Sequence, residues 1–383
     1  MAYKTLDQHL FDTGPKRILA LDGGGIRGAL TLGYLAKIES MLRDRVDGDS
    51  DFRLCDYFDL ISGTSTGSII AAGLALGFSV QKLQDIYQTL ADKVFEEGFL
   101  RFGVFNAKFP KEPLVEALKS YFGDETMGSD KLRTGLMVMT KRLDTGSPWL
   151  LHNNPRGKYY GARPGSTYTP NRDYLIRTVV RASAAAPHYF EPEQIQISPD
   201  TIGAFVDGGV SPYNNPALQS LMLATLSGYG LNWPFGEDQL MLVSVGTGFR
   251  GTKMDPADVM KMSAVNLAAQ SILSIMEDAN WLEQAVLQWM SHSPTSWKID
   301  SEVGDLRTDV LGNGQPLISY LRYNVTLEPD WLKQTLNLDL TDKKCAALYA
   351  MDDPDNVEEL TELGRNAAAV QIEDTHFPAG FDI

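Results

Sequence analysis

The sequence predicts an α/β protein of three layers, in which helices cover both faces of a mainly parallel central sheet. Two observations lead to this fold class. Short apolar runs of strand length alternate with segments of helical periodicity, and a glycine-rich turn joins strand to helix at residues 22–28 and again at residues 63–67. A strand followed by a helix that returns the chain to the same edge is the unit from which parallel sheets are built.

The first of these units starts with the apolar run at residues 17–21 and continues into the loop Asp-Gly-Gly-Gly-Ile-Arg-Gly at residues 22–28. Apolar side chains then recur at helical spacing, with charged residues between them: Tyr34, Leu35, Ile38, Met41 and Leu42. We therefore expect a strand, a loop and an amphipathic helix in this order.

The second unit repeats the pattern at once. A strand is expected at residues 57–61, followed by the turn Gly-Thr-Ser-Thr-Gly and by the segment 68–76, which is apolar nearly all round. A helix without a polar face belongs in the interior. This helix is therefore predicted to be central and buried.

Later elements follow the same alternation. Further strands are expected at residues 136–140, 204–206 and 240–245. The amphipathic stretch 257–290 carries an apolar side that we expect to pack on the core, and residues 357–372 are predicted to form a helix near the end. The chain is accordingly divided into a short N-terminal segment (1–15), a large α/β domain (16–325) and a helical C-terminal extension packed on it (326–383).

Two long irregular regions interrupt the pattern, and long loops in compact domains are usually functional. The first, residues 95–113, interleaves aromatic and basic side chains: Phe95, Phe99, Phe102, Phe105, Phe109, Arg101, Lys108 and Lys111. It is interpreted as a lid or satellite core in preference to a lipid-contacting surface. The second, residues 153–172, carries scattered Arg and Lys, which indicate a solvated face in preference to an anion site.

Composition limits the classes of function. The chain has 383 residues, 43% hydrophobic and 22% charged, which is typical of globular proteins. With 34 basic and 49 acidic residues its formal charge is −15, which disfavours DNA or RNA as a partner. The two cysteines, Cys55 and Cys345, suggest neither a disulfide framework nor a zinc site. Without a signal-like or membrane-spanning segment, we expect a cytoplasmic protein that meets membranes peripherally.

The strongest chemical signal is the turn Gly63-Thr-Ser65-Thr-Gly67, a G-x-S-x-G between a strand and a buried helix. A nucleophile elbow has this context, because a sharp turn there holds the serine in strained backbone geometry. Ser65 is thus the candidate nucleophile, with the positive end of the following helix near the developing oxyanion. The alternative is a glycine turn with a capping serine.

The glycine loop supplies candidates for the oxyanion site. Backbone N–H groups in Asp22-Gly23-Gly24-Gly25-Ile26-Arg27-Gly28 are unshielded by side chains and can converge on an anion. A phosphate-binding loop is the alternative, but the Lys-Ser/Thr pair of a Walker A motif is missing. Dinucleotide binding would require an acidic residue at the end of the next strand, which the sequence does not place there.

The base has two kinds of candidate. Histidine is the usual choice, and chain order would allow His188, His292 or His376 to serve in a Ser-His-Asp triad. Alternatively, Asp207 ends an apolar strand and is followed by Gly208 and Gly209, which permit close approach of another loop. Partial burial would have to raise its pKa for it to act as a base near neutrality.

Together, the glycine loop, the Gly63–Gly67 turn and Asp207-Gly-Gly209 resemble the patatin-like phospholipase family in this order. The resemblance extends to the Ala-Ala-Pro-His-Tyr-Phe run within residues 183–192 and to Gly246-Thr-Gly248, and it covers residues 16–250. It implies a patatin-like three-layer fold, Ser65 as nucleophile, Asp207 as its only catalytic partner, and Gly23, Gly24 and Gly25 around the oxyanion. Arg27 occupies the motif's basic position, as a structural ion pair or a substrate contact.

The resemblance implies hydrolysis of phospholipid or lysophospholipid acyl esters by a Ser-Asp dyad, with no metal, calcium or cofactor. A narrower alternative is a bacterial antiviral defence effector that a cyclic nucleotide switches on to degrade the cell's own membrane; the basic second loop or the region beyond Arg250 would house its site. Two further alternatives are a Ser-His-Asp esterase for soluble esters and a non-catalytic lipid-binding protein. Head-group preference, positional selectivity and oligomeric state stay open.

Overall fold

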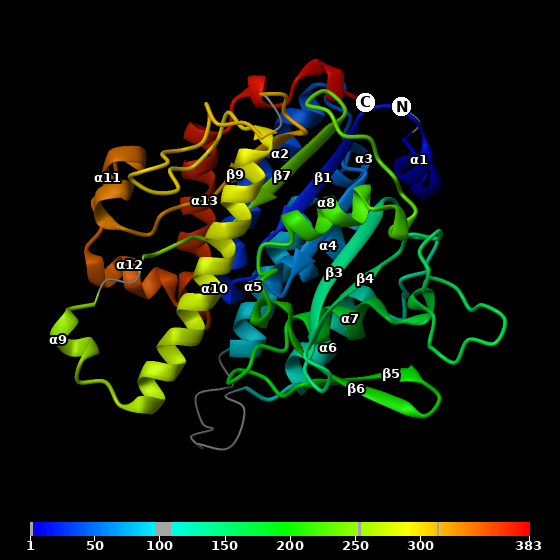
Figure 1. Cartoon of the computed structure of the whole chain (residues 1–383), viewed down its shortest axis with the longest axis horizontal. Coiled ribbons are helices and arrows are strands. Elements are labelled where there is room, and N and C mark those ends of the chain that lie inside the picture. Colours follow the sequence, from blue (N-terminus) through cyan, green and yellow to red (C-terminus); the bar gives the residue numbers. More distant parts are fainter. Residues whose placement is uncertain (1–2, 96–108, 252–253, 312–313) are drawn as a thin grey trace.

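The computed structural model describes residues 3–95, 109–251, 254–311 and 314–383. Within them a nine-stranded sheet has the order β5-β6-β3-β2-β1-β7-β9-β8, with β4 paired to β3 (Figure 1). The strands are β1 Lys16–Leu21, β2 Leu60–Thr64, β3 Gly135–Arg142, β4 Ser147–His152, β5 Glu193–Ser198, β6 Thr201–Asp207, β7 Leu240–Val245, β8 Ser291–His292 and β9 Ile318–Tyr323.

The central strands β3, β2, β1, β7, β9 and β8 run parallel, and only β4, β6 and β5 at one side are antiparallel. The described helices are α1 Leu6–Phe11, α2 Gly28–Asp44, α3 Leu54–Tyr57, α4 Thr66–Ala75, α5 Val80–Phe95, α6 Glu112–Phe122, α7 Ile176–Ser183, α8 Ala217–Thr225, α9 Pro256–Val259, α10 Ala264–Trp289, α11 Pro329–Leu336, α12 Asp342–Tyr349 and α13 Val357–Gln371. The predicted mixed α/β class with a mainly parallel sheet is confirmed.

Both faces of the sheet are buried. Along β1, Leu19 and Leu21 enter the core that also contains α2, α4 and α13, whereas Ile18 and Ala20 enter the core beneath α8. This alternation follows from the two-residue period of a strand. Helices α8 and α10 lie in front of the sheet in Figure 1, with α2 and α4 behind it. The C-terminal helix α13 packs along α2, so the end of the chain covers one face.

Several local predictions need correction. The expected strand at residues 57–61 is shifted, because Tyr57 ends α3 and β2 begins at Leu60. The strand at 204–206 is the end of β6, which pairs antiparallel with β3. The sequence does not predict strands β4, β5, β8 and β9. Strands β8 and β9 pair with strands that lie far away in the chain, whereas β4 and β5 belong to hairpins without a strong turn signature.

Helix α10 agrees in part with the prediction for residues 257–290: of the apolar side chains expected on the core side, Met276, Val286 and Met290 are half-buried, and Met290 packs on the core beneath α8. The fully buried contacts of α10 lie near its end and are mainly polar, from Glu283, Gln284 and Gln288 beside Leu287. Apolar side chains spaced by seven or eight residues are instead exposed: Leu267, Ile275, Leu282 and Trp289. Val265 and Ile272, which the pattern placed on the core side, lie outside the residues whose side chains are described.

The two irregular regions are partly described. In the Phe-rich region, residues 96–108 and the Phe95 side chain lie outside the description, while Phe109 is buried and packs on Tyr189 and Phe190. In the second region, the Arg156 guanidinium lies 3.7 Å from the ring centre of Phe11. Within the described part of the chain, no helix combines the length and apolar character needed to cross a bilayer.

Candidate active site

Ser65 occupies a sharp turn between β2 and α4 and has the unusual backbone angles φ 53° and ψ −125°. The two flanking glycines make this turn possible. A Cβ on Gly63 would lie 2.1 Å from the carbonyl oxygen of Gly67, and a Cβ on Gly67 would lie 2.3 Å from that of Leu21. Such strain in a non-glycine residue persists only where the surroundings enforce it, and it characterises a nucleophile elbow.

Two serines hold this turn in place. The Ser65 N–H donates to the Ser183 hydroxyl at 2.8 Å, and that hydroxyl donates to the Met139 carbonyl at 2.6 Å. The Ser68 hydroxyl donates to the Ser65 carbonyl at 2.6 Å. Ser183 thus fixes the elbow to strand β3, a link that the sequence did not reveal because Ser183 is separated from Ser65 by more than a hundred residues.

Asp207 lies at the end of β6, and its carboxylate accepts hydrogen bonds from the Ser65 hydroxyl and from the Gly209 N–H, the latter at 2.7 Å. The side chain is buried. Burial raises the pKa of Asp207 to about 6, against the opposing effects of these two hydrogen bonds and of the Arg181 charge. Gly208, next in the chain, packs on the Met139 carbonyl. The two residues of the predicted dyad are therefore in contact, and Asp207 has the basicity of a weak general base.

The glycine loop lies beside Ser65, but its three amides are not equivalent. The Gly23 N–H donates to the Asn214 carbonyl at 3.1 Å, so it is not available to an oxyanion. By contrast, the N–H groups of Gly24 and Gly25 have no hydrogen-bond partner among the described residues, and both glycines line the cavity over Ser65. The Gly23 carbonyl and amide therefore hold the loop in place, and the placing of Gly23, Gly24 and Gly25 around an oxyanion stays a prediction.

The loop is fixed by side chains that the sequence analysis missed. Thr247, just after β7, donates its hydroxyl to the Gly23 carbonyl at 2.9 Å, and the Asn214 side-chain amide donates to the same carbonyl at 3.4 Å. The Gly246-Thr-Gly248 run was one available signal for Thr247, whereas nothing in the local sequence marks Asn214. Thr247 reaches the loop because the parallel strands β1 and β7 end at the same edge of the sheet, and Asn214 lies in the segment that joins β6 to α8.

At the start of the loop, Asp22 forms a bidentate ion pair with Arg322 of β9. The two guanidinium nitrogens lie 2.9 Å and 2.6 Å from the carboxylate oxygens, and both side chains are buried. One of those nitrogens also donates to the Ser244 hydroxyl at 2.7 Å. Burial alone would lower the pKa of Arg322, but the facing Asp22 raises it above its ordinary value. The pair connects the glycine loop to β9, which lies beyond β7 in the sheet.

Arg27 forms no ion pair with any described residue, whereas its predicted contact with substrate stays a prediction. Its guanidinium donates to the carbonyls of Gly24 and Gly248, at 3.3 Å and 3.2 Å, and lies 4.1 Å from the ring centre of Tyr349. It is buried and lines the cavity. Gly28 begins α2. Arg27 therefore braces the loop against the C-terminal region through main-chain carbonyls and an aromatic ring, rather than through an ion pair.

A cavity of about 890 Å³ opens over Ser65, Asp207 and the glycine loop. Its walls are largely apolar and come from α4, α5, α6, α10 and the segment before β5; they include Ile69, Leu90, Val94, Leu114, Phe190 and Met276. A cavity of this size and lining suits an acyl chain better than a small polar ester.

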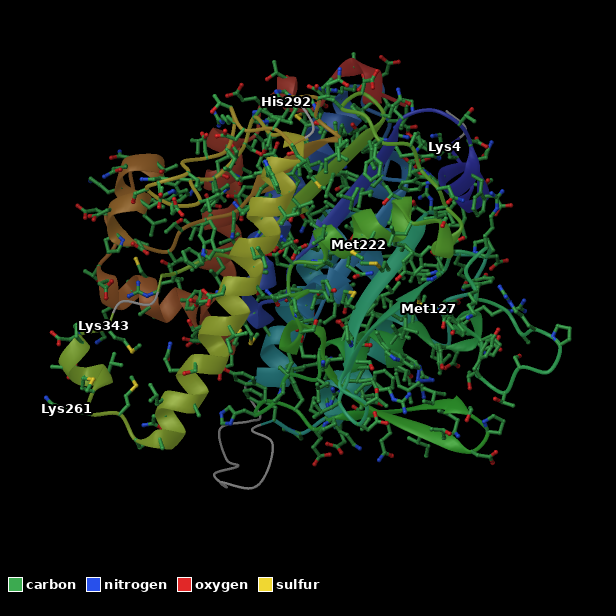
Figure 2. All side chains as sticks on the ribbon, viewed as in Figure 1. Lys4, Met127, Met222, Lys261, His292 and Lys343 are labelled. Atoms are coloured by element: carbon green, nitrogen blue, oxygen red, sulfur yellow. The ribbon has the colours of Figure 1, made fainter. Side chains whose placement is uncertain are left out.

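The three histidines kept as alternative bases lie elsewhere. His292 contacts Glu237 at 2.8 Å and is in β8, which pairs with the first residues of β9 at the end of the sheet opposite Ser65 (Figure 2). His376 hydrogen-bonds Tyr323 at 3.0 Å, and His188 is exposed. No described residue lining the cavity is a histidine, and the described residues include no cluster of His, Cys, Asp and Glu that could hold a metal.

The fold and this site have the arrangement expected of an α/β serine hydrolase, with a strained serine in contact with a buried aspartate at the base of an apolar cavity. Residues 19–221 match the family model described as Patatin-like phospholipase. The chain therefore belongs to the patatin-like phospholipase family.

Three relatives show how the similarity is distributed. A cGAMP-activated phospholipase of Vibrio cholerae is 34% identical over 217 residues, which cover 54% of this chain and 56% of that protein. A cUMP-AMP-activated phospholipase of Escherichia coli is 30% identical over 261 residues, covering 68% and 73%. Patatin-T5 of Solanum tuberosum is 27% identical over 248 residues, covering 60% of each. The chain thus spans little more than half the length of the Vibrio relative.

Proposed function

We propose that the chain is a lipid acyl hydrolase, a carboxylic ester hydrolase that cleaves fatty-acyl esters of phospholipids or lysophospholipids. The observation that carries this proposal is the hydrogen bond between strained Ser65 and buried Asp207 at the base of a large apolar cavity. A strained serine in contact with a carboxylate of raised pKa has a catalytic use and no evident structural one.

The chemistry follows from the positions of the groups. Asp207 takes the hydroxyl proton as Ser65 Oγ attacks the ester carbonyl, and the N–H groups of Gly24 and Gly25 stabilise the resulting oxyanion. The proton passes to the leaving alcohol as the ester bond breaks, which leaves an acyl-serine. Asp207 then takes a proton from water, whose oxygen attacks the acyl carbon. Ser65 leaves with that proton, and the fatty acid is released.

We further propose that a cyclic dinucleotide switches this activity on. Two relatives that are 34% and 30% identical carry names that describe activation by cGAMP and by cUMP-AMP. An ungated phospholipase would damage the membrane of its own cell. Gating fits the role of a bacterial antiviral defence effector, which degrades that membrane only when a signal nucleotide is present.

The test is fatty-acid release from vesicles of phosphatidylethanolamine and phosphatidylglycerol by the wild type and by Ser65→Ala. Each protein is assayed with EDTA, and with or without cGAMP or cUMP-AMP. Release that persists in EDTA and is lost in Ser65→Ala supports the hydrolase, and dependence on one nucleotide supports gating. No release under any condition would reject the hydrolase in favour of a lipid-binding protein, and full release without nucleotide would reject the gating.

The pH dependence of hydrolysis should report the pKa of Asp207, which burial raises to about 6. Asp207 accepts a proton only when ionised, so kcat/KM should rise with pH through about 6 and fall about tenfold per unit below it. Phosphatidylcholine is a suitable substrate because its head group does not titrate in this range. An acidic limb centred near 4 would mean that burial does not raise the pKa of the base above the ordinary value of an aspartate.

Replacing Gly24 by alanine should disable the oxyanion loop. The added Cβ would lie 2.2 Å from Thr247 Oγ1 and 2.6 Å from Thr247 Cβ, so the loop must shift. Loss of one oxyanion donor costs about 10²–10³ in rate. Gly161→Ala is the control, because a Cβ there meets nothing within 4 Å. A kcat of Gly24→Ala equal to that of the wild type would show that this loop takes no part in the mechanism.

We propose that the exposed apolar face of α10 contacts the bilayer that supplies the substrate. This helix also lines the active-site cavity through Gln270, Met276 and Glu277, so its outer face adjoins the route of entry. Ile275 and Leu282 are 65% and 67% exposed, and replacing both by Asp should weaken vesicle binding at least about tenfold.

The matched control for this membrane contact replaces two exposed apolar residues elsewhere, Ile202 and Leu226, by Asp. Hydrolysis of a dispersed short-chain ester should be unchanged in both double variants. Equal vesicle co-sedimentation of the two would place the membrane contact on another surface.

A further inference from the structure

A second cavity, of about 560 Å³, lies along the outer edge of β9. The short strand β8 pairs with only the first two residues of β9, so Arg322 and Tyr323 further along the strand face this cavity. Its other walls are the loop that follows α10, helix α11 and the segment after α13. The volume is within the range of small-molecule sites.

The lining of this cavity combines aromatic rings with positive charge. Three of the six tryptophans of the chain line it, Trp281, Trp297 and Trp331. Lys298 and Arg307 lie among them, in a chain whose formal charge is −15. Aromatic faces stack nucleobases, and guanidinium and ammonium groups bind phosphate. Rings and cations gathered at one cavity therefore fit a ligand that has both bases and phosphates.

The loop that carries the two cations is fastened to α10. Buried Gln288 donates through its side-chain amide to the carbonyls of Trp297 and Asp305, at 2.8 Å and 3.0 Å, and it accepts from the Trp297 N–H at 2.9 Å. Because α10 also forms a wall of the active-site cavity, a ligand that moves this loop would move that wall.

Two further contacts join the cavities. Phe249 lines both of them and packs edge-on against Trp281 of α10. Arg322 lines the second cavity and holds Asp22, the first residue of the glycine loop, through the bidentate ion pair. A ligand bound along β9 would therefore touch both the wall of the active site and the support of its oxyanion loop.

We infer that this cavity is the binding site of a cyclic dinucleotide, with its bases between the tryptophans and its phosphates on Lys298 and Arg307. This inference rests on the proposed function, since it places the activator of that hydrolase. Binding would favour the arrangement of α10 and of the glycine loop that is competent for hydrolysis, by its differential contacts with the two arrangements.

The test is calorimetric titration of the Ser65→Ala protein with cGAMP and cUMP-AMP, with inorganic phosphate as the probe for simple anion binding. Saturable binding of one dinucleotide, with quenching of tryptophan fluorescence, is expected. Arg307→Gln should raise its Kd about tenfold or more. Arg172→Gln is the matched control, because both arginines are exposed and paired with a nearby aspartate. Trp331→Ala should also weaken binding about tenfold, whereas Trp331→Phe should restore most of the affinity.

Lys298→Glu provides a second variant at an exposed position, where folding is not at risk, with Lys343→Glu as its control. Unchanged Kd values in Arg307→Gln, Trp331→Ala and Lys298→Glu would overturn the site, as would binding of phosphate alone with the affinity of the dinucleotide. Nucleotide-dependent hydrolysis that survives all three substitutions would keep the proposed function and reject this cavity. If the protein binds the dinucleotide through these residues but has no hydrolase activity, the cavity is kept as the binding site and the proposed function is rejected.

Discussion

Asp207→Asn is expected to abolish nearly all ester hydrolysis while leaving the fold intact. The asparagine side chain has the volume of the aspartate side chain, but its amide cannot accept the Ser65 proton. Its NH₂ group is a donor, so it cannot replace an oxygen that accepts the hydrogen bond of the Gly209 N–H. Loss of a general base, or of the group that orients it, costs roughly 10³–10⁴-fold in rate. The measurement is kcat/KM for vesicle and short-chain ester substrates, with circular dichroism to confirm folding.

Three controls make this result specific. Asp200→Asn changes an exposed aspartate in the turn between β5 and β6 and should be silent. His188→Ala and His292→Ala should also keep full activity, because neither histidine lines the cavity. Activity that persists in Asp207→Asn and disappears in a histidine variant would establish the Ser-His-Asp esterase instead.

The parts of the site that are encoded locally could be predicted from the sequence. A strand, a G-x-S-x-G turn and an apolar helix lie within twenty residues, so position and backbone strain at Ser65 follow from neighbouring residues. Asp207 could be predicted for a similar reason, because it is a carboxylate at the end of a strand next to two glycines. Its contact with Ser65 is a tertiary fact, and only the order of the three motifs in the family pattern indicated it.

Contacts between distant segments could not be predicted. Arg322 lies three hundred residues from Asp22, and its only local signal is a charge within the otherwise uncharged strand Ile318–Tyr323. The use of the Gly23 amide by Asn214 depends on how two loops meet. For helix α10, periodicity indicates an apolar side that faces the core, but it does not indicate that further apolar residues lie outside that side. Here Ile275 and Leu282 face outward.

Which side chains of α10 face the core and which face solvent is relevant to regulation. A soluble helix normally buries its apolar residues, yet α10 meets the core through Glu283 as well as Leu287, and the Glu283 carboxylate accepts the Leu218 N–H at 2.5 Å in the first turn of α8. Burial raises the pKa of Glu283 well above its ordinary value. A helix held by buried polar groups, with apolar residues in water, is less firmly seated than one packed through apolar side chains. Such a helix is suited to a change of position when a ligand binds beside it.

The ion pair between Asp22 and Arg322 gives the second large expected effect, on stability. Asp22→Asn leaves a fully buried guanidinium without its counter-charge, which should lower the free energy of unfolding by about 3–5 kcal/mol. Arg322→Met leaves a buried carboxylate, which can escape by taking up a proton, whereas arginine cannot lose one. The cost of Arg322→Met should therefore be smaller, and smaller at pH 5 than at pH 8, because burial raises the pKa of Asp22 and Arg322, which opposes that rise, is gone.

The double variant Asp22→Asn/Arg322→Met completes a cycle that isolates the coupling. With neither charge buried, its stability should recover most of the loss, since a neutral pair of similar volume is often as stable as a buried ion pair. Urea unfolding of all four proteins at both pH values measures this, and additive costs would show that the pair is not coupled. Activity should not recover with stability. The main-chain bond from the N–H of residue 22 to the Val245 carbonyl remains in the double variant, but the guanidinium that joins the side chain of residue 22 to Ser244 is lost, so the double variant would fold with a loosened oxyanion loop.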